Sequence, residues 1–65
     1  MHEGVVLDGL SVLLVEDDSE LQRMLTAELE QAGLAVTAAG SFRGAQDLLD
    51  DMEFDLAVLD VMLPD

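Results

Sequence analysis

Two short apolar runs, each followed at once by acidic residues, constrain the fold of this chain most strongly. The first run covers residues 10–15 and ends at Glu16, and the second covers residues 56–59 and ends at Asp60. Apart from Ser11, both runs are continuously apolar rather than alternating, which is typical of strands buried on both faces of a parallel sheet. We therefore expect parallel strands that end in carboxylates.

The segment after the first run predicts an amphipathic helix. Apolar residues recur at helical spacing over residues 21–32, and Gly33 stands where a glycine commonly ends a helix. We expect the helix to begin at a cap on Asp18 or Ser19, and Ser19 with Gln22 has the form of a capping box.

A second strand is predicted over residues 34–39, followed by a helix over residues 42–52 with its cap at Ser41. We expect Met24 and Met52, one on each helix, to lie in the core. The resulting βαβαβ pattern predicts an α/β fold, because strands that alternate with helices form parallel sheets through right-handed crossovers. With a strand order of 2-1-3, the first and third strands are neighbours.

Charge and composition exclude several functions. The chain has 65 residues, of which fifteen are Asp or Glu and two are Arg, and its formal charge is −13. Such a chain has no basic surface for direct binding to nucleic acid or to an anionic membrane. A hydrophobic content of 51% argues against a disordered acidic tail, and the absence of Cys with a single His argues against a zinc site. With no signal peptide or membrane-spanning run, we expect a soluble, cytoplasmic protein.

Three carboxylates are predicted to meet at one edge of the sheet. Glu16 and Asp17 follow the first strand and Asp60 follows the third, so all three fall at the carboxyl edge, where open α/β sheets bind ligands. Each pair of like charges about 5 Å apart costs roughly 3 kcal/mol at an effective dielectric constant near 20. A hard divalent cation such as Mg²⁺ relieves this repulsion, and a carboxylate beside the cation is a competent nucleophile for phosphoryl transfer.

The two motifs that carry these acids are similar to those of a known family. Residues 12–18 (VLLVEDD) and 55–65 (DLAVLDVMLPD) together resemble the receiver domain of two-component response regulators. The resemblance implies a flavodoxin-like parallel sheet, present here as a truncated βαβαβ unit of order 2-1-3 from a complete order of 2-1-3-4-5. We expect residues 1–9 to be a flexible lead-in and residues 10–65 to be the N-terminal half of a receiver domain.

The resemblance also implies roles for individual residues. Asp60 would be the phosphoacceptor, taking a phosphoryl group from a sensor histidine kinase or a phosphotransfer protein. Mg²⁺ would be held by Glu16, Asp17, Asp60 and the backbone carbonyl of Met62, with Asp18 as a helix cap rather than a ligand. The hydroxyl and lysine that the family places after its fourth and fifth strands have no counterpart here, and the chain contains no lysine. We therefore expect this chain to be phosphorylated slowly.

Two other functional classes compete with the phosphoacceptor. A receiver fragment that is not phosphorylated would act as an interaction module and would self-associate through its exposed third strand. A Mg²⁺-dependent phosphohydrolase would use a similar aspartate, but such enzymes place a second acid two residues after the nucleophile, where this chain has Met62. A signalling module, rather than an enzyme, is therefore the favoured interpretation.

Overall fold

The computed structural model describes residues 9–59 as alternating strands and helices. In chain order these are β1 (Ser11–Val15), α1 (Ser19–Gln31), β2 (Ala35–Ala39), α2 (Phe42–Asp51) and β3 (Leu56–Leu59). Apart from Gly9, the predicted lead-in lies outside the described residues, as do Asp60 and Met62. The predicted βαβαβ order is confirmed, and each boundary falls within a residue of its predicted place.

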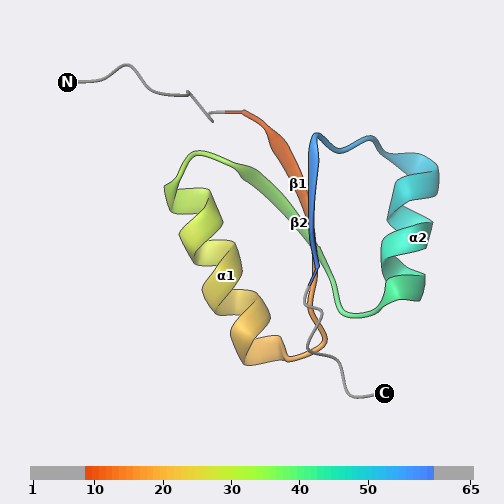
Figure 1. The fold of residues 1–65 in the computed structure, drawn as a ribbon, viewed down its shortest axis with the longest axis horizontal. Helices are drawn as coiled ribbons and strands as arrows, with labels where there is room; N and C mark the ends of the chain where they lie inside the picture. Colours follow the sequence, from red (N-terminus) through yellow and green to blue (C-terminus); the bar gives the residue numbers. More distant parts are fainter. Residues whose placement is uncertain (1–8, 60–65) are drawn as a thin grey trace.

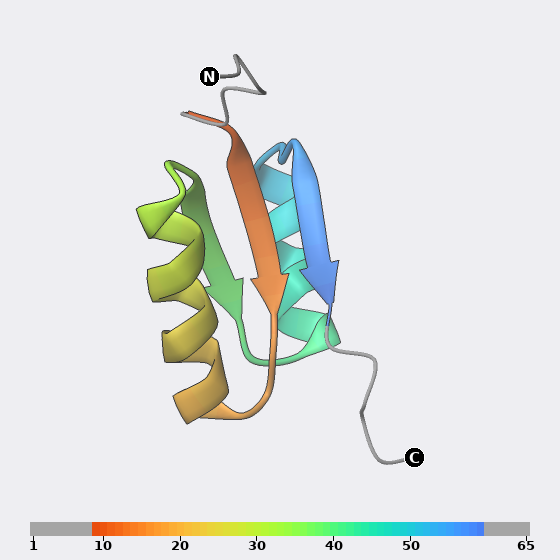
Figure 2. The same ribbon diagram turned by 60° about the vertical axis from the view of Figure 1, so that its left-hand side comes forward.

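β1 lies at the centre of a parallel sheet, whose order within residues 9–59 is β2-β1-β3 (Figure 2). It pairs along its whole length with β2. With β3 it pairs from Val12 opposite Leu56 to Val15 opposite Leu59. The predicted strand order of 2-1-3 is thus confirmed, and the ends of β1 and β3 lie level with each other.

The two helices cover opposite faces of this sheet (Figure 1). β1 is therefore the strand that is covered on both sides, and its residues from Val12 to Val15 are all buried. β3 differs, because all four of its residues are exposed. Neither helix of the described segment is long and apolar enough to cross a lipid bilayer.

The start of α1 corrects one prediction. Asp18 is the N-cap, and its Oδ1 accepts hydrogen bonds from the backbone N–H groups of Glu20 at 2.9 Å and Leu21 at 3.1 Å. Ser19 is already the first helical residue, so the predicted capping box between Ser19 and Gln22 is wrong. Asp18 excludes it because its carboxylate satisfies the free N–H groups of the first turn.

The other helix boundaries agree with the sequence. Gly33 follows the C-cap of α1 with φ of +98°, a conformation that costs residues with a Cβ roughly 1–2 kcal/mol. Ser41 caps α2, and its Oγ accepts a hydrogen bond from the N–H of Gly44 at 3.0 Å. These residues set the ends of the helices and so the short connections that return the chain to the sheet.

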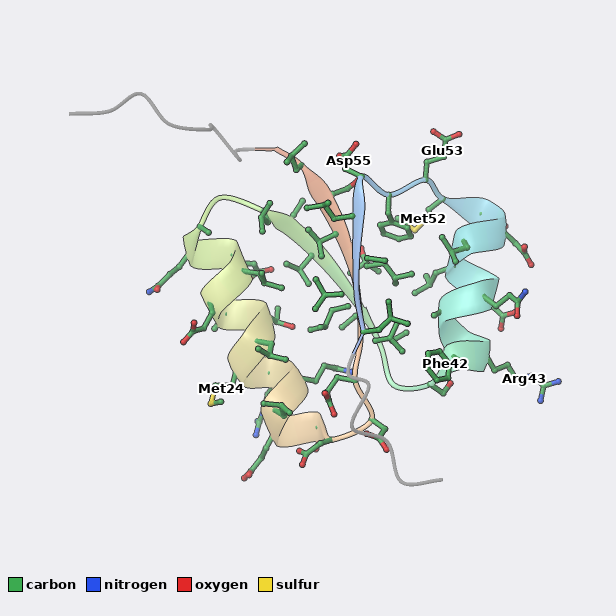
Figure 3. The ribbon with its side chains drawn as sticks, in the orientation of Figure 1. Met24, Phe42, Arg43, Met52, Glu53 and Asp55 are labelled. Carbon is green, nitrogen blue, oxygen red and sulfur yellow. The ribbon has the colours of Figure 1, made fainter. Side chains whose placement is uncertain are left out.

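The prediction that Met24 and Met52 belong to the core is wrong. Met24 is 58% exposed on α1 and points away from the sheet, and Met52 is 43% exposed after the end of α2 (Figure 3). The partly buried residues of α1 are Leu21, Gln22, Leu25, Thr26 and Leu29, so the face of this helix that turns toward the sheet leaves out Met24. The compact apolar cluster on the α2 side is formed by Leu13, Val15, Ala39 and Ala45, with Leu48 and Phe54 packed against it.

Candidate functional site at the carboxyl edge

Glu16 lies directly after the last residue of β1, at the carboxyl edge of the sheet. Val15 and Leu59 are the last paired residues of β1 and β3. Neighbouring strands lie about 4.8 Å apart, so the carboxyl ends of β1 and β3 lie close together. The residue that follows Leu59 in the sequence is Asp60, which is beyond the described segment.

The Glu16 side chain is buried, with an exposed fraction of 2%. Its Oε2 accepts a hydrogen bond from the backbone N–H of Asp18 at 3.0 Å. Its own backbone N–H donates to the carbonyl oxygen of Ala39 at 3.0 Å, which extends the pairing of β1 and β2 by one residue. Both the main chain and the carboxylate of Glu16 are therefore held in place.

Gln22 also supports this edge, in a role that the sequence analysis missed. Its Nε2 donates to the carbonyl oxygens of Glu16 at 3.0 Å and of Ala39 at 3.3 Å. One side chain of α1 thereby fastens the ends of β1 and β2. The sequence offered a local explanation for Gln22 in the capping box, whereas its second carbonyl partner is seventeen residues away.

The two acids after Glu16 have different surroundings. Asp17 is exposed, so its carboxylate is accessible to a ligand. Asp18 is committed to the first turn of α1 through the two hydrogen bonds described above. Its predicted role as a helix cap is thus confirmed, which leaves Glu16 and Asp17 as the candidate metal ligands of this loop.

Glu16 and Asp17 supply oxygen donors, the type that Mg²⁺ prefers in proteins. Burial of a carboxylate costs free energy unless hydrogen bonds or an opposite charge compensate it, and the 2% exposed Glu16 receives one such hydrogen bond from the N–H of Asp18. Within residues 9–59 no three potential ligands gather. The remaining predicted ligands, Asp60 and the Met62 carbonyl, follow that segment, and the complete ligand set remains a prediction.

A polar pair that the sequence analysis missed joins β1 and β3 at the opposite edge of the sheet. Asp55, at the amino end of β3 (Figure 3), accepts hydrogen bonds at Oδ2 from the backbone N–H and the Oγ of Ser11. Its own N–H donates to the Oγ and carbonyl oxygen of Ser11. The sequence contains one feature that could have predicted this pair: Ser11 and Asp55 each stand five residues before an acid of the predicted site.

Comparison with known proteins finds relatives among regulatory and sensor proteins. The chain is 41% identical over 58 residues to the transcriptional regulatory protein GltR of Pseudomonas aeruginosa, a match that covers 89% of this chain and 24% of GltR. It is 35% identical over 54 residues to the response regulator receiver protein CpdR of Brucella abortus, covering 83% of this chain and 45% of CpdR. It is 36% identical over 66 residues to the sensor protein TorS of Escherichia coli, covering 100% of this chain and 7% of TorS. The chain thus spans less than half the length of each of these relatives.

No solved structure matches the chain at a significant level. The family model for the response regulator receiver domain matches residues 12–65, which include both acidic motifs. Receiver domains are the signalling modules of two-component regulatory systems, and several relatives are named as transcriptional regulators. Sequence motifs, strand order and family match agree, and this chain belongs to the response regulator receiver domain family.

Proposed function

We propose that Asp60 accepts a phosphoryl group from a histidine kinase or a phosphotransfer protein, with Mg²⁺ bound beside it. The observation that carries this proposal is the pairing of Val15 with Leu59. Because Glu16 and Asp60 are the next residues of two adjacent parallel strands, this register favours their meeting at the carboxyl edge.

Each acid has a defined task in this proposal. A carboxylate oxygen of Asp60 attacks the phosphorus of the donor, a P–O bond forms, and the bond from phosphorus to the donor breaks. Glu16, Asp17, Asp60 and the Met62 carbonyl would hold Mg²⁺, which supplies positive charge to the phosphoryl oxygens. Gln22 keeps the loop that carries Glu16 and Asp17 attached to the strand ends.

We further propose that residues 10–65 form the N-terminal half of a receiver domain. The chain has no lysine to contact the phosphoryl oxygens. Stabilisation of the transferring group by a fixed cationic side chain contributes strongly to such reactions. This chain should therefore accept phosphate slowly.

Labelling with a small acyl phosphate tests the phosphoacceptor. In the presence of Mg²⁺, the chain should slowly incorporate one acid-stable, base-labile phosphoryl group, and removal of Mg²⁺ should suppress incorporation. Asp60→Asn should abolish labelling. Asp51→Asn, which changes an exposed acid of α2, should not. No labelling of the unchanged chain, or undiminished labelling of Asp60→Asn, would contradict the proposal.

The exposed edge of β3 supports a second candidate function, self-association. β3 pairs with β1 along one edge, and within residues 9–59 no strand pairs with its other edge. Leu56 is 48% exposed and Leu59 is 45% exposed. Beside β3, facing α2, is an apolar hollow of about 240 Å³, lined by Leu13, Val15, Phe42, Ala45, Gln46, Leu49, Ala57 and Leu59.

The partner that this edge suits best is the β3 edge of a second copy of the chain. With a charge of −13, two copies repel each other over most of their surfaces. The strand from Leu56 to Leu59 carries no charge, so pairing of two β3 edges opposes no like charges within the four strand residues. An unprotected apolar edge of this kind is a template for pairing with another strand.

Sedimentation over a range of concentrations tests this second function. The chain should form dimers, and Leu59→Lys should shift the population toward monomers because a charged side chain on the edge opposes pairing. Met24→Lys is the matched control, since it makes the same charge change at an exposed apolar residue on the outer side of α1. A wild-type chain that remains a compact, cooperatively unfolding monomer would refute self-association.

A further inference from the structure

Four hydrogen bonds join Ser11, the first residue of β1, to Asp55, the residue just before β3. Asp55 Oδ2 lies 2.8 Å from the Ser11 backbone nitrogen and 3.2 Å from its Oγ. The Asp55 backbone nitrogen lies 2.9 Å from the Ser11 carbonyl oxygen and 3.1 Å from its Oγ. The two residues therefore bind each other through both main chain and side chains.

The Ser11–Asp55 pair is a specific polar contact that can fix how β3 aligns with β1. No helix of the described segment has a close backbone contact with β3, which is held to the sheet by β1. Residues 12–15 of β1 and the four residues of β3 are apolar on both faces, so alternation of apolar and polar side chains does not mark one register of β3 against β1. Register is strongly specified where one face is buried and the other is polar, and that pattern is absent from these two strands.

Ser11 and Asp55 each precede one of the two acids by the same number of residues. Glu16 is the fifth residue after Ser11, and Asp60 is the fifth residue after Asp55. Fixing Ser11 opposite Asp55 is therefore equivalent to fixing Val15 opposite Leu59, the residues that precede the two acids in the sequence. A slip of one residue would displace Leu59 by about 3.3 Å relative to Val15 and turn the side chains of β3 toward the opposite face of the sheet.

We propose that Asp55 is a positioning residue, which sets the register of β3 through Ser11 so that Asp60 emerges beside Glu16. This inference rests on the proposed role of Asp60 as the phosphoacceptor. Asp55 acts from the other end of the strand and does not touch the reacting groups. Its loss should therefore lower phosphorylation through misplacement of Asp60, even in molecules that remain folded.

Two readouts on the full chain separate positioning from stability. The first is the pattern of nuclear Overhauser effects between the backbones of Val15 and Leu59, which reports register directly. The second is the rate of phosphorylation by a small acyl phosphate with Mg²⁺, per folded molecule. In Asp55→Ala, the Val15–Leu59 effects should weaken or shift to other partners, and the rate should fall about 10–100-fold, the size expected from a misplacement of an ångström or more.

Matched variants make the test specific. Asp55→Asn retains an oxygen that can accept from Ser11 and should restore most of the register and rate. Ser11→Ala removes the hydroxyl from the other side of the pair and should act in the same direction as Asp55→Ala. If Asp55→Ala is unfolded, Ser11→Ala and Asp55→Asn provide the comparison. Glu53→Ala, which removes an exposed acid of the same loop that points away from the sheet (Figure 3), should leave both readouts unchanged.

The outcomes distinguish this inference from the proposed function. Wild-type register and rate in folded Asp55→Ala and Ser11→Ala would overturn the positioning role, even if both variants were less stable. Failure of the unchanged chain to accept phosphate would instead overturn the role of Asp60. In that case the nuclear Overhauser effects would still decide whether Asp55 sets the register.

Discussion

Replacement of Gln22 by alanine should loosen the carboxyl edge of the sheet and destabilise the whole chain. The variant loses the hydrogen bonds from Gln22 Nε2 to the carbonyl oxygens of Glu16 and Ala39. A neutral hydrogen bond contributes about 0.5–1.5 kcal/mol to stability. The Ala39 carbonyl keeps its bond from the Glu16 N–H, and the bond from Gln22 to Ala39 is the longer of the two. We therefore expect a total loss of about 1–2 kcal/mol.

For a domain of this size, 1 kcal/mol lowers the melting temperature by roughly 4–8 °C, so Gln22→Ala should melt about 5–15 °C below the unchanged chain. Urea unfolding followed by far-ultraviolet circular dichroism measures the free energy of unfolding and its denaturant slope. Gln31→Ala is the control, because Gln31 is an exposed residue of the same helix and its side chain makes no hydrogen bond within residues 9–59. Equal free energies of unfolding for the two variants would refute the assigned role of Gln22.

Two further predictions concern the ends of α1. Asp18→Ala should lower the free energy of unfolding by about 1 kcal/mol, because the N–H groups of Glu20 and Leu21 lose their acceptor, and Asp18→Ser should recover most of it. An equal loss in both variants, measured by urea unfolding, would count against the cap. Gly33→Ala should cost roughly 1–2 kcal/mol because φ at this residue is +98°. An unchanged midpoint in thermal unfolding would contradict that reasoning.

The order of the elements was predictable because the signals that determine it are local. The continuous apolarity of residues 12–15 indicates a strand covered on both faces, and the structure buries all four residues. Gly33 and Ser41 mark a helix end and a helix start by their own backbone and hydrogen-bonding chemistry. Burial on the helices was less predictable. The apolar spacing placed Met24 on the inner face of α1, whereas the structure turns a face with the polar residues Gln22 and Thr26 toward the sheet.

The hydrogen bonds that hold the strand ends near the candidate site could not be predicted from local sequence patterns. Gln22 bonds to the carbonyl of Ala39, and Ser11 bonds to Asp55 across 44 residues, so both contacts require the folded sheet. Asp18 rather than Ser19 is the N-cap of α1. The sequence left this choice open because both residue types are common at N-caps. The acids themselves were identifiable because each follows an apolar run, and Glu16 lies at the predicted edge.

Direct mapping of the modified residue tests the central claim most clearly. The chain is treated with a small acyl phosphate and Mg²⁺, the acyl phosphate formed on the protein is reduced with borohydride, and the peptides are sequenced by mass spectrometry. Reduction of an aspartyl phosphate yields homoserine, and we expect homoserine at residue 60, with none at Asp17 and none when Mg²⁺ is removed by a chelator. Homoserine at another acid, or an unmodified Asp60 in labelled protein, would contradict the account.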